Sequence, residues 1–229
     1  MTLEPFQVVA IDGGAASGKT TLCLGAARAL GYGYLNTGAF YRCLALACLR
    51  ENVLPADVER LVAMVGVLRV RLQGHPDRPA VFLEEEDVTQ IIRSPDVTSL
   101  VSAVSSDPSV RAQVVLLQRE AAQTMVDELG GIVADGRDST TVVFPNAGVK
   151  ILLVAADEAR RARTLGSALS FRQGVLDRDR VDNEATGFLT AGPGVLVRDS
   201  LEDSVEILVA EIVRLVRGQD FASQGSDSQ

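Results

Sequence analysis

The chain has 229 residues, of which 47% are apolar and 23% are charged. This is an ordinary globular balance, and the length suits one large domain or one domain that carries an insertion. The formal net charge of −8 argues against binding to a nucleic-acid backbone as the main function, although an acidic protein can still hold a basic pocket for a small phosphate ligand.

Cysteine usage and hydropathy exclude further classes of protein. The three cysteines, Cys23, Cys43 and Cys48, form no Cys-x-x-Cys pair, so neither a disulfide framework nor a zinc site is indicated. We expect reduced, buried, structural thiols. The first residues lack the basic start and apolar run of a signal peptide, and no stretch reaches membrane-spanning length. We therefore expect a cytoplasmic protein with no membrane partner.

The first part of the chain alternates strands with helices. Residues 7–12 form an apolar strand that ends at Asp12, and a glycine-rich loop follows it. Apolar spacing then predicts the next elements. In order, we expect a helix over about residues 19–30, a short strand over 31–35, and helices over about 38–51 and 56–65.

The hydrophobic period then changes from helical to alternating. Apolar and arginine residues alternate over residues 67–72, which predicts a strand. A turn at residues 74–79 and a returning strand over residues 80–83 follow. This β-rich stretch inside an α/β chain indicates an insertion of about residues 67–110. We interpret His75, which lies in the turn, as structural or incidental.

The remaining elements return to the α/β pattern. Strands that alternate with helices predict a parallel sheet with right-handed crossovers. The polar end of the chain predicts a disordered tail over residues 218–229, after a single domain over residues 1–217. In order, we expect helices over about residues 95–104 and 108–128, strands over 132–134 and 149–154, an arginine-rich helix over 156–171, a strand over 195–197 and an amphipathic helix over 201–217.

The strongest motif lies between the first strand and the first helix. Residues 13–20 read GGAASGKT and match the P-loop pattern G-x-x-x-x-G-K-[ST] without a mismatch and in the right context. The glycines let backbone N–H groups converge on phosphate oxygens, and the helix N-terminus adds partial positive charge. Lys19 is predicted to reach the β- and γ-phosphates of ATP, and Thr20 to place its hydroxyl on Mg²⁺. The residues expected to bind ATP are Gly13, Gly14, Ala15, Ala16, Ser17, Gly18, Lys19, Thr20 and Thr21.

Two further observations bear on this loop. Lysine occurs only at Lys19 and Lys150, against 20 arginines, so a lysine kept inside the loop points to its chemistry rather than to solubility. The sequence holds no guanine-reading N-K-x-D motif, which argues against a GTPase. The loop identifies a phosphate donor and leaves the acceptor open. A mere glycine turn before a helix is the alternative interpretation.

A second group of candidates follows the strand at residues 132–134. Asp135 ends this strand, where a carboxylate would face a metal ion from the carboxyl edge of the sheet. A turn-forming or capping aspartate is the alternative. Arg137 could clamp a phosphate with two parallel hydrogen bonds, and Asp138 could read a polar group of the acceptor.

Taken together, these motifs resemble those of bacterial cytidylate kinases, a family of P-loop nucleoside monophosphate kinases. The resemblance runs nearly continuously from about residue 7 to residue 160, and its most specific part is DGRD followed by TVVFP. The matching segments after the P-loop are LNTGAFYR (35–42), EDV (86–88), IIR (91–93), VS (101–102), PSVR (108–111), ADGRD (134–138), TVVFP (141–145) and KILL (150–153).

The resemblance implies a P-loop NTPase fold. Its α/β core would be a parallel five-stranded sheet flanked by helices, with a β-containing acceptor-binding insertion and a mobile lid. The lid would lie over about residues 156–180 and would be shorter than is usual for the family. ATP and a small phosphorylated acceptor would be the substrates of a monomer, with Mg²⁺ held by Thr20 and, through water, by Asp135.

The resemblance also implies roles for side chains. Arg42 and Arg137 would hold the phosphate of the acceptor, with Thr37 and Tyr41 beside them. The residues implied to read cytosine are Ser102, Arg111 and Asp138, and those implied to face the ribose are Arg178 and Asp182. Arginines of the lid, among Arg160, Arg161 and Arg163, would stabilise the transferring group, and we take Arg163 as catalytic together with Lys19, Asp135 and Arg137. A solvated helix face is the alternative for the lid arginines.

The chain departs from the family pattern at its acceptor side. Asn36 stands where the pattern has aspartate, Thr140 where it has glycine, and Ala185 where it has arginine. Loss of that arginine would weaken recognition of the base or leave room for a different acceptor. Removing one partner of a buried charge pair typically costs several kcal/mol.

The sequence predicts an enzyme that transfers a phosphoryl group from ATP to CMP or dCMP, giving CDP or dCDP. A phosphate acceptor is already an anion and needs no general base, whereas a hydroxyl acceptor needs one. The absence of a carboxylate at Asn36 favours a phosphate acceptor, although Asp138 remains available as a base. Two alternatives stay open: a kinase of the same fold that acts on a modified nucleotide or a pathway metabolite, and a non-catalytic nucleotide-binding regulatory protein.

Overall fold

A five-stranded parallel sheet forms the centre of the molecule. The computed structural model describes residues 3–155 and 190–224. The order of the strands in the sheet is β2-β6-β1-β7-β8, and every neighbouring pair is parallel. Their bounds are β1 Val8–Gly13, β2 Gly33–Asn36, β6 Ile132–Gly136, β7 Val149–Val154 and β8 Leu196–Asp199. The predicted α/β class and parallel five-stranded core are confirmed.

Helices cover both faces of this sheet. Val9 and Ile11 of β1 pack in one apolar cluster with helices α1 (Lys19–Leu30) and α8 (Val205–Gln224). Val8 and Ala10 point the other way and pack with α5 (Pro108–Leu129). Because both faces are covered, every residue of β1 is buried, which explains why the strands read as continuous apolar runs.

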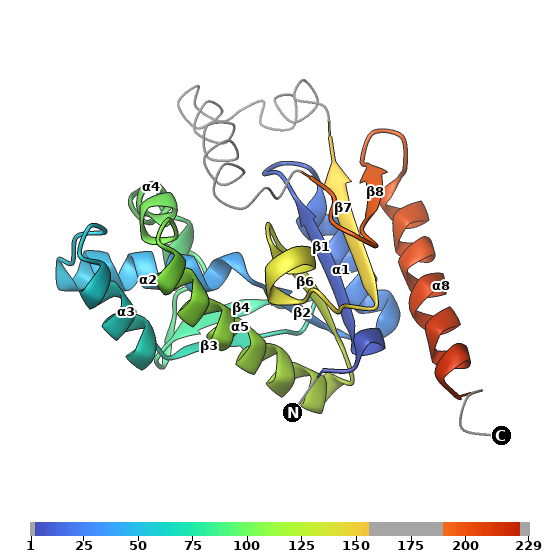
Figure 1. The fold of residues 1–229 in the computed structure, drawn as a ribbon, viewed down its shortest axis with the longest axis horizontal. Coiled ribbons are helices and arrows are strands. Elements are labelled where there is room, and N and C mark those ends of the chain that lie inside the picture. The colour runs from blue at the N-terminus through green and yellow to red at the C-terminus, as the bar shows by residue number, and fades with distance from the viewer. Residues whose placement is uncertain (1–2, 156–189, 225–229) are drawn as a thin grey trace.

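A second body, built around its own apolar core, lies beside the sheet. Its core residues come from α2 (Gly38–Glu51), α3 (Val58–Val67), α4 (Pro95–Val104) and strands β3 and β4. Figure 1 shows these helices gathered at the left, away from α8. The strands form a small antiparallel sheet of β3 (Val70–Gln73), β4 (Ala80–Leu83) and β5 (Glu86–Asp87). The predicted strand pair is therefore present, although α3 continues to Val67 and the first strand begins only at Val70.

Helix α5 joins the two bodies. It begins at Asp107, whose carboxylate accepts bonds from the N–H groups of Ser109 and Val110, and it ends at Gly130 with a left-handed φ of 78°. Its first turns pack in the core of the second body, and its later turns pack on the central sheet. Side chains in the middle of α5 are thereby brought to the junction between the two bodies.

The loop between β1 and α1 has the backbone that its glycines predict. Gly18 adopts a φ of 93°, a conformation that side chains with Cβ rarely adopt, and α1 begins at the next residue. Ala16 also has a positive φ, 61°, and costs roughly 1 kcal/mol of local strain. This arrangement turns the chain sharply from the strand into the helix, as a P-loop requires.

The last helix differs from its expected limits. Helix α8 runs from Val205 to Gln224, whereas the sequence analysis placed it over residues 201–217 and expected disorder from residue 218. That boundary is wrong for residues 218–224, because extending an existing helix past one glycine costs only about 1 kcal/mol and no proline stops it.

The helix expected over residues 156–171 lies outside the described residues. Among the helices that are described, none combines the length and apolarity needed to cross a membrane.

Candidate active site

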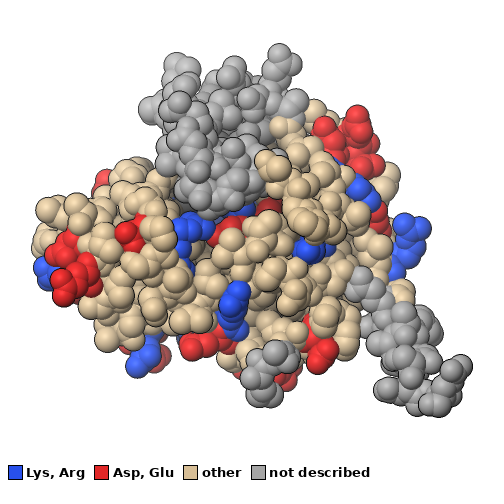
Figure 2. All heavy atoms as spheres, viewed as in Figure 1, with Lys and Arg blue, Asp and Glu red and all other residues tan. Residues whose placement is uncertain are grey.

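A cavity opens at the carboxyl edge of the central sheet, where β1, β2 and β6 end. The second body closes its other side with residues of α2, α4 and α5. Figure 2 shows that acidic and basic side chains are mixed on the visible face instead of forming one large patch of either sign. The residues that line the cavity are Gly13, Ala15, Lys19, Thr20, Asn36, Thr37, Gly38, Tyr41, Arg42, Val101, Ser105, Arg111, Asp135, Gly136, Arg137 and Asp138.

The carboxylate of Asp135 is the centre of one end of this cavity. It forms an ion pair with the ammonium group of Lys19, which comes from the P-loop. Its other oxygen accepts hydrogen bonds from the hydroxyls of Thr20, at 2.7 Å, and Tyr34, at 2.9 Å. The side chain of Asp135 is only 5% exposed, so these three partners replace the water that burial removes.

Burial and neighbouring charge shift the pKa of Lys19 in opposite directions. Burial is the largest single influence and lowers the pKa of Lys19, but the charge of Asp135, that of Cys23 and the hydrogen bond to Asp135 together outweigh burial and raise the pKa of Lys19 above its ordinary value. Lys19 therefore stays positively charged in the cavity. For Tyr34, burial and the same carboxylate both raise the pKa, so its hydroxyl stays protonated and donates to Asp135.

A second buried carboxylate, that of Asp12, lies next to the P-loop. It accepts bonds from the N–H of Ser139 at 2.9 Å, the N–H of Thr140 at 2.7 Å and the hydroxyl of Thr140 at 2.7 Å. Burial raises the pKa of Asp12, and the bonds from Thr140 and Ser139 partly oppose this rise. The contacts fix the turn over Ser139–Val143 that follows Arg137 and Asp138.

At the other end of the cavity, Arg111 of α5 forms an ion pair with Asp138. The guanidinium of Arg111 also lies over the ring of Tyr41, 5.7 Å from its centroid, and donates to the carbonyl of Ser105. Burial raises the pKa of Asp138, while the charge of Arg111 opposes that rise. The hydroxyl of Tyr41 is buried and has no hydrogen-bond partner among the described residues.

Arg42 and Arg137 also line the cavity. Arg42 donates to the carbonyl of Ile92 at 2.8 Å and to the hydroxyl of Thr98 at 2.9 Å, which are both neutral acceptors. Burial lowers the pKa of Arg42, and the positive charges of Arg93 and Arg137 lower it further. Like charges that are held together in a partly buried site form a place where an anion is stabilised.

The structure brings most of the predicted site residues into this one cavity. From the P-loop it places Gly13, Ala15, Lys19 and Thr20 on the cavity wall, whereas Gly14, Ala16, Ser17, Gly18 and Thr21 do not line it. It also places there Asp135, expected at the metal, and, from the expected acceptor side, Thr37, Tyr41, Arg42, Arg111, Arg137 and Asp138. Arg160, Arg161, Arg163, Arg178, Asp182 and Ala185 lie outside the described residues.

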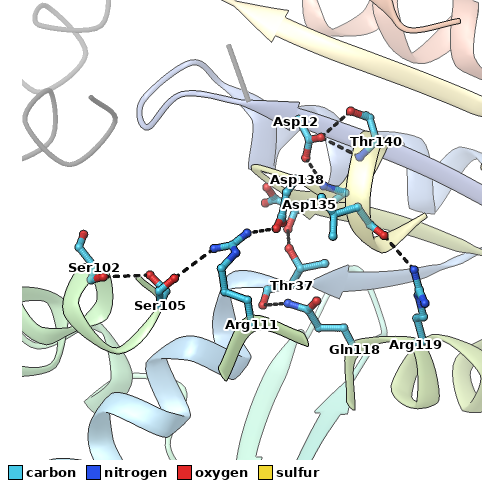
Figure 3. Close-up of polar contacts among 12 residues, drawn as sticks. Asp12, Thr37, Ser102, Ser105, Arg111, Gln118, Arg119, Asp135, Asp138 and Thr140 are labelled. Carbon is cyan, nitrogen blue, oxygen red and sulfur yellow. Dashed lines mark hydrogen bonds and ion pairs between the residues drawn. The ribbon is translucent and has the colours of Figure 1, made fainter. Parts of the chain in front are cut away.

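Ser102, which was predicted for the acceptor side, does not line the cavity. Ser102 was expected to read the base, but the cavity is lined by Ser105, three residues further along the chain. The hydroxyl of Ser105 donates to the carbonyl of Ser102 at 3.3 Å (Figure 3). Helix α4 ends at Val104, so the residue that leaves the helix, Ser105, faces the cavity instead of the one inside it.

Several residues that support the site were not predicted from the sequence. Asp12 was noted only as the end of a strand, and Tyr34 only as part of one. Gln118 of α5 is fully buried and donates to the carbonyl of Thr37 at 3.0 Å (Figure 3). A polar glutamine among the apolar positions of a helix, and an acidic residue directly before a P-loop, were the signals that could have found them.

Lys150, His75 and the three cysteines do not line the cavity. Lys150, the second lysine, donates to the carbonyls of Pro145 at 3.0 Å and Pro193 at 2.9 Å. His75 lies on an exposed turn beside Asp77. The three cysteines are free thiols and are buried, as predicted.

Comparison with known proteins agrees with this geometry. The family model described as "Cytidylate kinase" matches residues 9–218. A cytidylate kinase of Mycolicibacterium paratuberculosis is 42% identical over 221 residues, which cover 92% of this chain and 95% of that protein. One from Mycobacterium avium is 48% identical over 156 residues, covering 68% and 67% of the two chains. A third, from Geobacillus thermodenitrificans, is 39% identical over 224 residues, covering 93% and 98%. The chain therefore belongs to the cytidylate kinase family.

Proposed function

We propose that this protein transfers the terminal phosphoryl group of ATP to the phosphate of CMP or dCMP, giving CDP or dCDP. One observation carries the proposal: a single cavity holds the Lys19–Asp135 pair of the P-loop at one end and the Arg111–Asp138 pair at the other. Arg42 and Arg137 line the same cavity. Family membership supports the same activity.

The donor end suits the phosphates of ATP. The N-terminus of α1 and the charged Lys19 offer positive charge to the β- and γ-phosphates. We propose that Mg²⁺ binds here, because the hydroxyl of Thr20 and the carboxylate of Asp135 lie 2.7 Å apart and are the oxygen donors that this ion prefers. When bound, the ion would offset the charge that develops between the β- and γ-phosphates. Asp135 would hold it through water.

The part of the cavity lined by Arg42 and Arg137 suits the phosphate of the acceptor. Burial lowers the pKa of Arg42, and repulsion from the positive charges of Arg93 and Arg137 lowers it further. A phosphate placed between Arg42 and Arg137 would relieve that repulsion and accept charge-assisted hydrogen bonds. Its oxygen is already an anion, so the reaction requires alignment and charge stabilisation instead of a general base.

The far end suits cytosine better than uracil. The pyrimidine edge of cytosine offers an amino donor beside the N3 acceptor, whereas uracil offers an acceptor beside an N–H donor. The carboxylate of Asp138 accepts and the guanidinium of Arg111 donates, so this pair is complementary to cytosine. A uracil in the same position would place a carbonyl oxygen against the carboxylate of Asp138. Both groups are acceptors, so they would be buried without a hydrogen bond between them.

The remaining assignments extend this proposal. We propose that Thr37 and Tyr41 line the acceptor site, that the insertion over about residues 67–110 helps to form it, and that the lid covers about residues 156–180. Arg163 would stabilise the transferring group, and Arg178 and Asp182 would face the ribose. The family pattern supports these roles, because the residues stand at matching positions.

A screen of acceptors tests the proposal. Purified protein with ATP and Mg²⁺ would be offered CMP, dCMP, UMP, AMP and GMP, and formation of ADP would be followed. We expect turnover with CMP and dCMP and a value of kcat/KM at least about tenfold lower with the others. Turnover with another monophosphate alone would reassign the acceptor, and no turnover with any pyrimidine monophosphate would overturn the proposal.

A variant of the base-reading pair sharpens the screen. Asp138→Asn replaces an acceptor-only group with one that also donates, so we expect kcat/KM to fall for CMP and to rise relative to CMP for UMP. The matched control is Asp127→Asn, an exposed aspartate of α5 that accepts only from Gln123 of its own helix. An unchanged ratio between CMP and UMP in Asp138→Asn would contradict the role of Asp138.

A further inference from the structure

One buried carboxylate connects the two halves of the active site. Asp12 directly precedes Gly13, the first residue of the P-loop, and is only 1% exposed. Its partners, Ser139 and Thr140, directly follow Arg137 and Asp138. Figure 3 shows these contacts: Asp12 receives two backbone N–H groups and the hydroxyl of Thr140 from the turn.

Other contacts also restrict the backbone of the turn over Ser139–Val143, which carries these partners. A Cβ atom added to Gly136 would overlap the hydroxyl oxygens of Ser139 and Thr37, so the backbone passes through a space that only glycine fits. From α5, the guanidinium of Arg119 donates to the carbonyls of Val142 and Val143, both at 2.9 Å. Asp12 is the contact that ties this turn to the strand of the P-loop.

Thr140 adds a contact that the family pattern does not supply. The pattern has glycine at this position, and glycine has no side chain that could donate a hydrogen bond. The hydroxyl of Thr140 lies 2.7 Å from the carboxylate of Asp12. Burying a carboxylate that lacks hydrogen-bond donors costs free energy. In this chain three donors satisfy the carboxylate of Asp12, whereas a glycine at position 140 would leave only the two backbone N–H groups.

We propose that Asp12 and Thr140 are positioning residues that hold Arg137 and Asp138 in register with the P-loop. They touch neither the phosphates nor the base, and act through the turn that they fix. This inference rests on the proposed function, because it assigns Arg137 and Asp138 to the acceptor. Loosening the contact moves the acceptor groups and leaves the P-loop, which has its own hydrogen bonds, in place.

The test compares three threonine variants. Thr140→Val keeps the shape of the side chain and removes the donor, Thr140→Ser keeps the donor, and Thr124→Val is the control. Thr124 is an exposed threonine of α5 whose hydroxyl donates to the carbonyl of Glu120 in the same helix. We expect Thr140→Val to raise the KM for CMP about five- to tenfold, which is what loss of one hydrogen bond typically causes. The KM for ATP should stay unchanged, and Thr140→Ser should restore the KM for CMP.

A second measurement does not depend on turnover. Amide hydrogen exchange at Ser139 and Thr140, followed by NMR, should be about fivefold or more faster in Thr140→Val than in wild type and Thr124→Val. Asp12→Asn should accelerate it further. Absence of CMP turnover in wild type would count against the proposed function alone, and exchange would still decide the inference. Unchanged exchange in Thr140→Val, or equal changes of KM for CMP and ATP, would overturn it.

Discussion

At the scale of single residues, two carboxylates organise the site, and each is satisfied in a different way. Asp135 accepts from the side chains of Lys19 and Thr20, at the start of α1, and of Tyr34 in β2. Asp12 accepts mainly from the backbone of one turn. The first arrangement can exchange partners when phosphates and an ion arrive. The second has no exposed partner to exchange and suits a permanent contact.

The two lysines of the chain provide a matched pair for testing the donor site. Lys19→Ala removes the charge offered to the β- and γ-phosphates, so we expect kcat to fall by roughly 10²- to 10³-fold. Circular dichroism should show the wild-type fold. Lys150→Ala removes a lysine whose partners among the described residues are two backbone carbonyls, and it should keep the kcat of wild type. Equal losses of kcat in the two variants would contradict a specific role for Lys19.

How far the position of a residue in the cavity follows from the sequence depends on how local the evidence for it is. Lys19 and Thr20 follow from eight consecutive residues, because the geometry of a P-loop is set locally. Tyr34 and Asp135 lie 101 positions apart in the sequence, and no local pattern reveals such a contact. Ser102 was displaced by Ser105 because the end of α4 decides which serine faces the cavity, and helix ends are the least certain limits in a sequence.

At the scale of elements, the segment between β6 and β7 determines how the site is shaped. The chain leaves β6 at Gly136, presents Arg137 and Asp138 to the cavity, and then forms the tight turn over Ser139–Val143. The sequence predicted the strand before and the strand after it. It did not predict the turn, because its conformation depends on a carboxylate from β1 and an arginine from α5.

A substitution at Gly136 tests how closely the backbone before this turn is packed. A methyl group at Gly136 would overlap the hydroxyls of Thr37 and Ser139, so we expect Gly136→Ala to lower the free energy of unfolding by about 1–3 kcal/mol and to reduce kcat/KM for CMP. The measurement is urea unfolding combined with steady-state kinetics.

The control is Gly66→Ala in α3. A Cβ at Gly66 meets no atom within 4 Å, and alanine favours a helix interior by up to about 1 kcal/mol over glycine. The control should therefore be as stable as wild type or more stable. If Gly136→Ala unfolded at the same urea concentration as Gly66→Ala, the space around Gly136 would be wider than the structure shows.

At the scale of the whole molecule, the cavity lies where two separate apolar cores meet. The central sheet carries the P-loop, and the second body carries Tyr41, Arg42 and, through the first turns of α5, Arg111. The edge of the sheet and the second body are also joined by the N–H of Tyr34, which donates to the carbonyl of Gly74 at 2.8 Å. The parallel sheet and the antiparallel insertion were predictable from hydrophobic periodicity, whereas their meeting at one cavity required the three-dimensional arrangement of α5.

The charge of the whole chain and the charge of the cavity also differ. The chain has a net charge of −8, yet Lys19, Arg42, Arg111 and Arg137 all line one cavity. Phosphate groups of both substrates would be attracted to this place on an otherwise acidic molecule. Donor and acceptor sites that share one cavity imply direct transfer between the two substrates.

Transfer of a labelled phosphoryl group tests this central claim most directly. ATP that carries a radioactive γ-phosphate would be incubated with Mg²⁺, CMP and the protein, and the products would be separated by chromatography. Our account predicts that the label appears in CDP, at a rate that matches the formation of ADP. Label found only in inorganic phosphate, or remaining in ATP while CMP is present in excess, would contradict it.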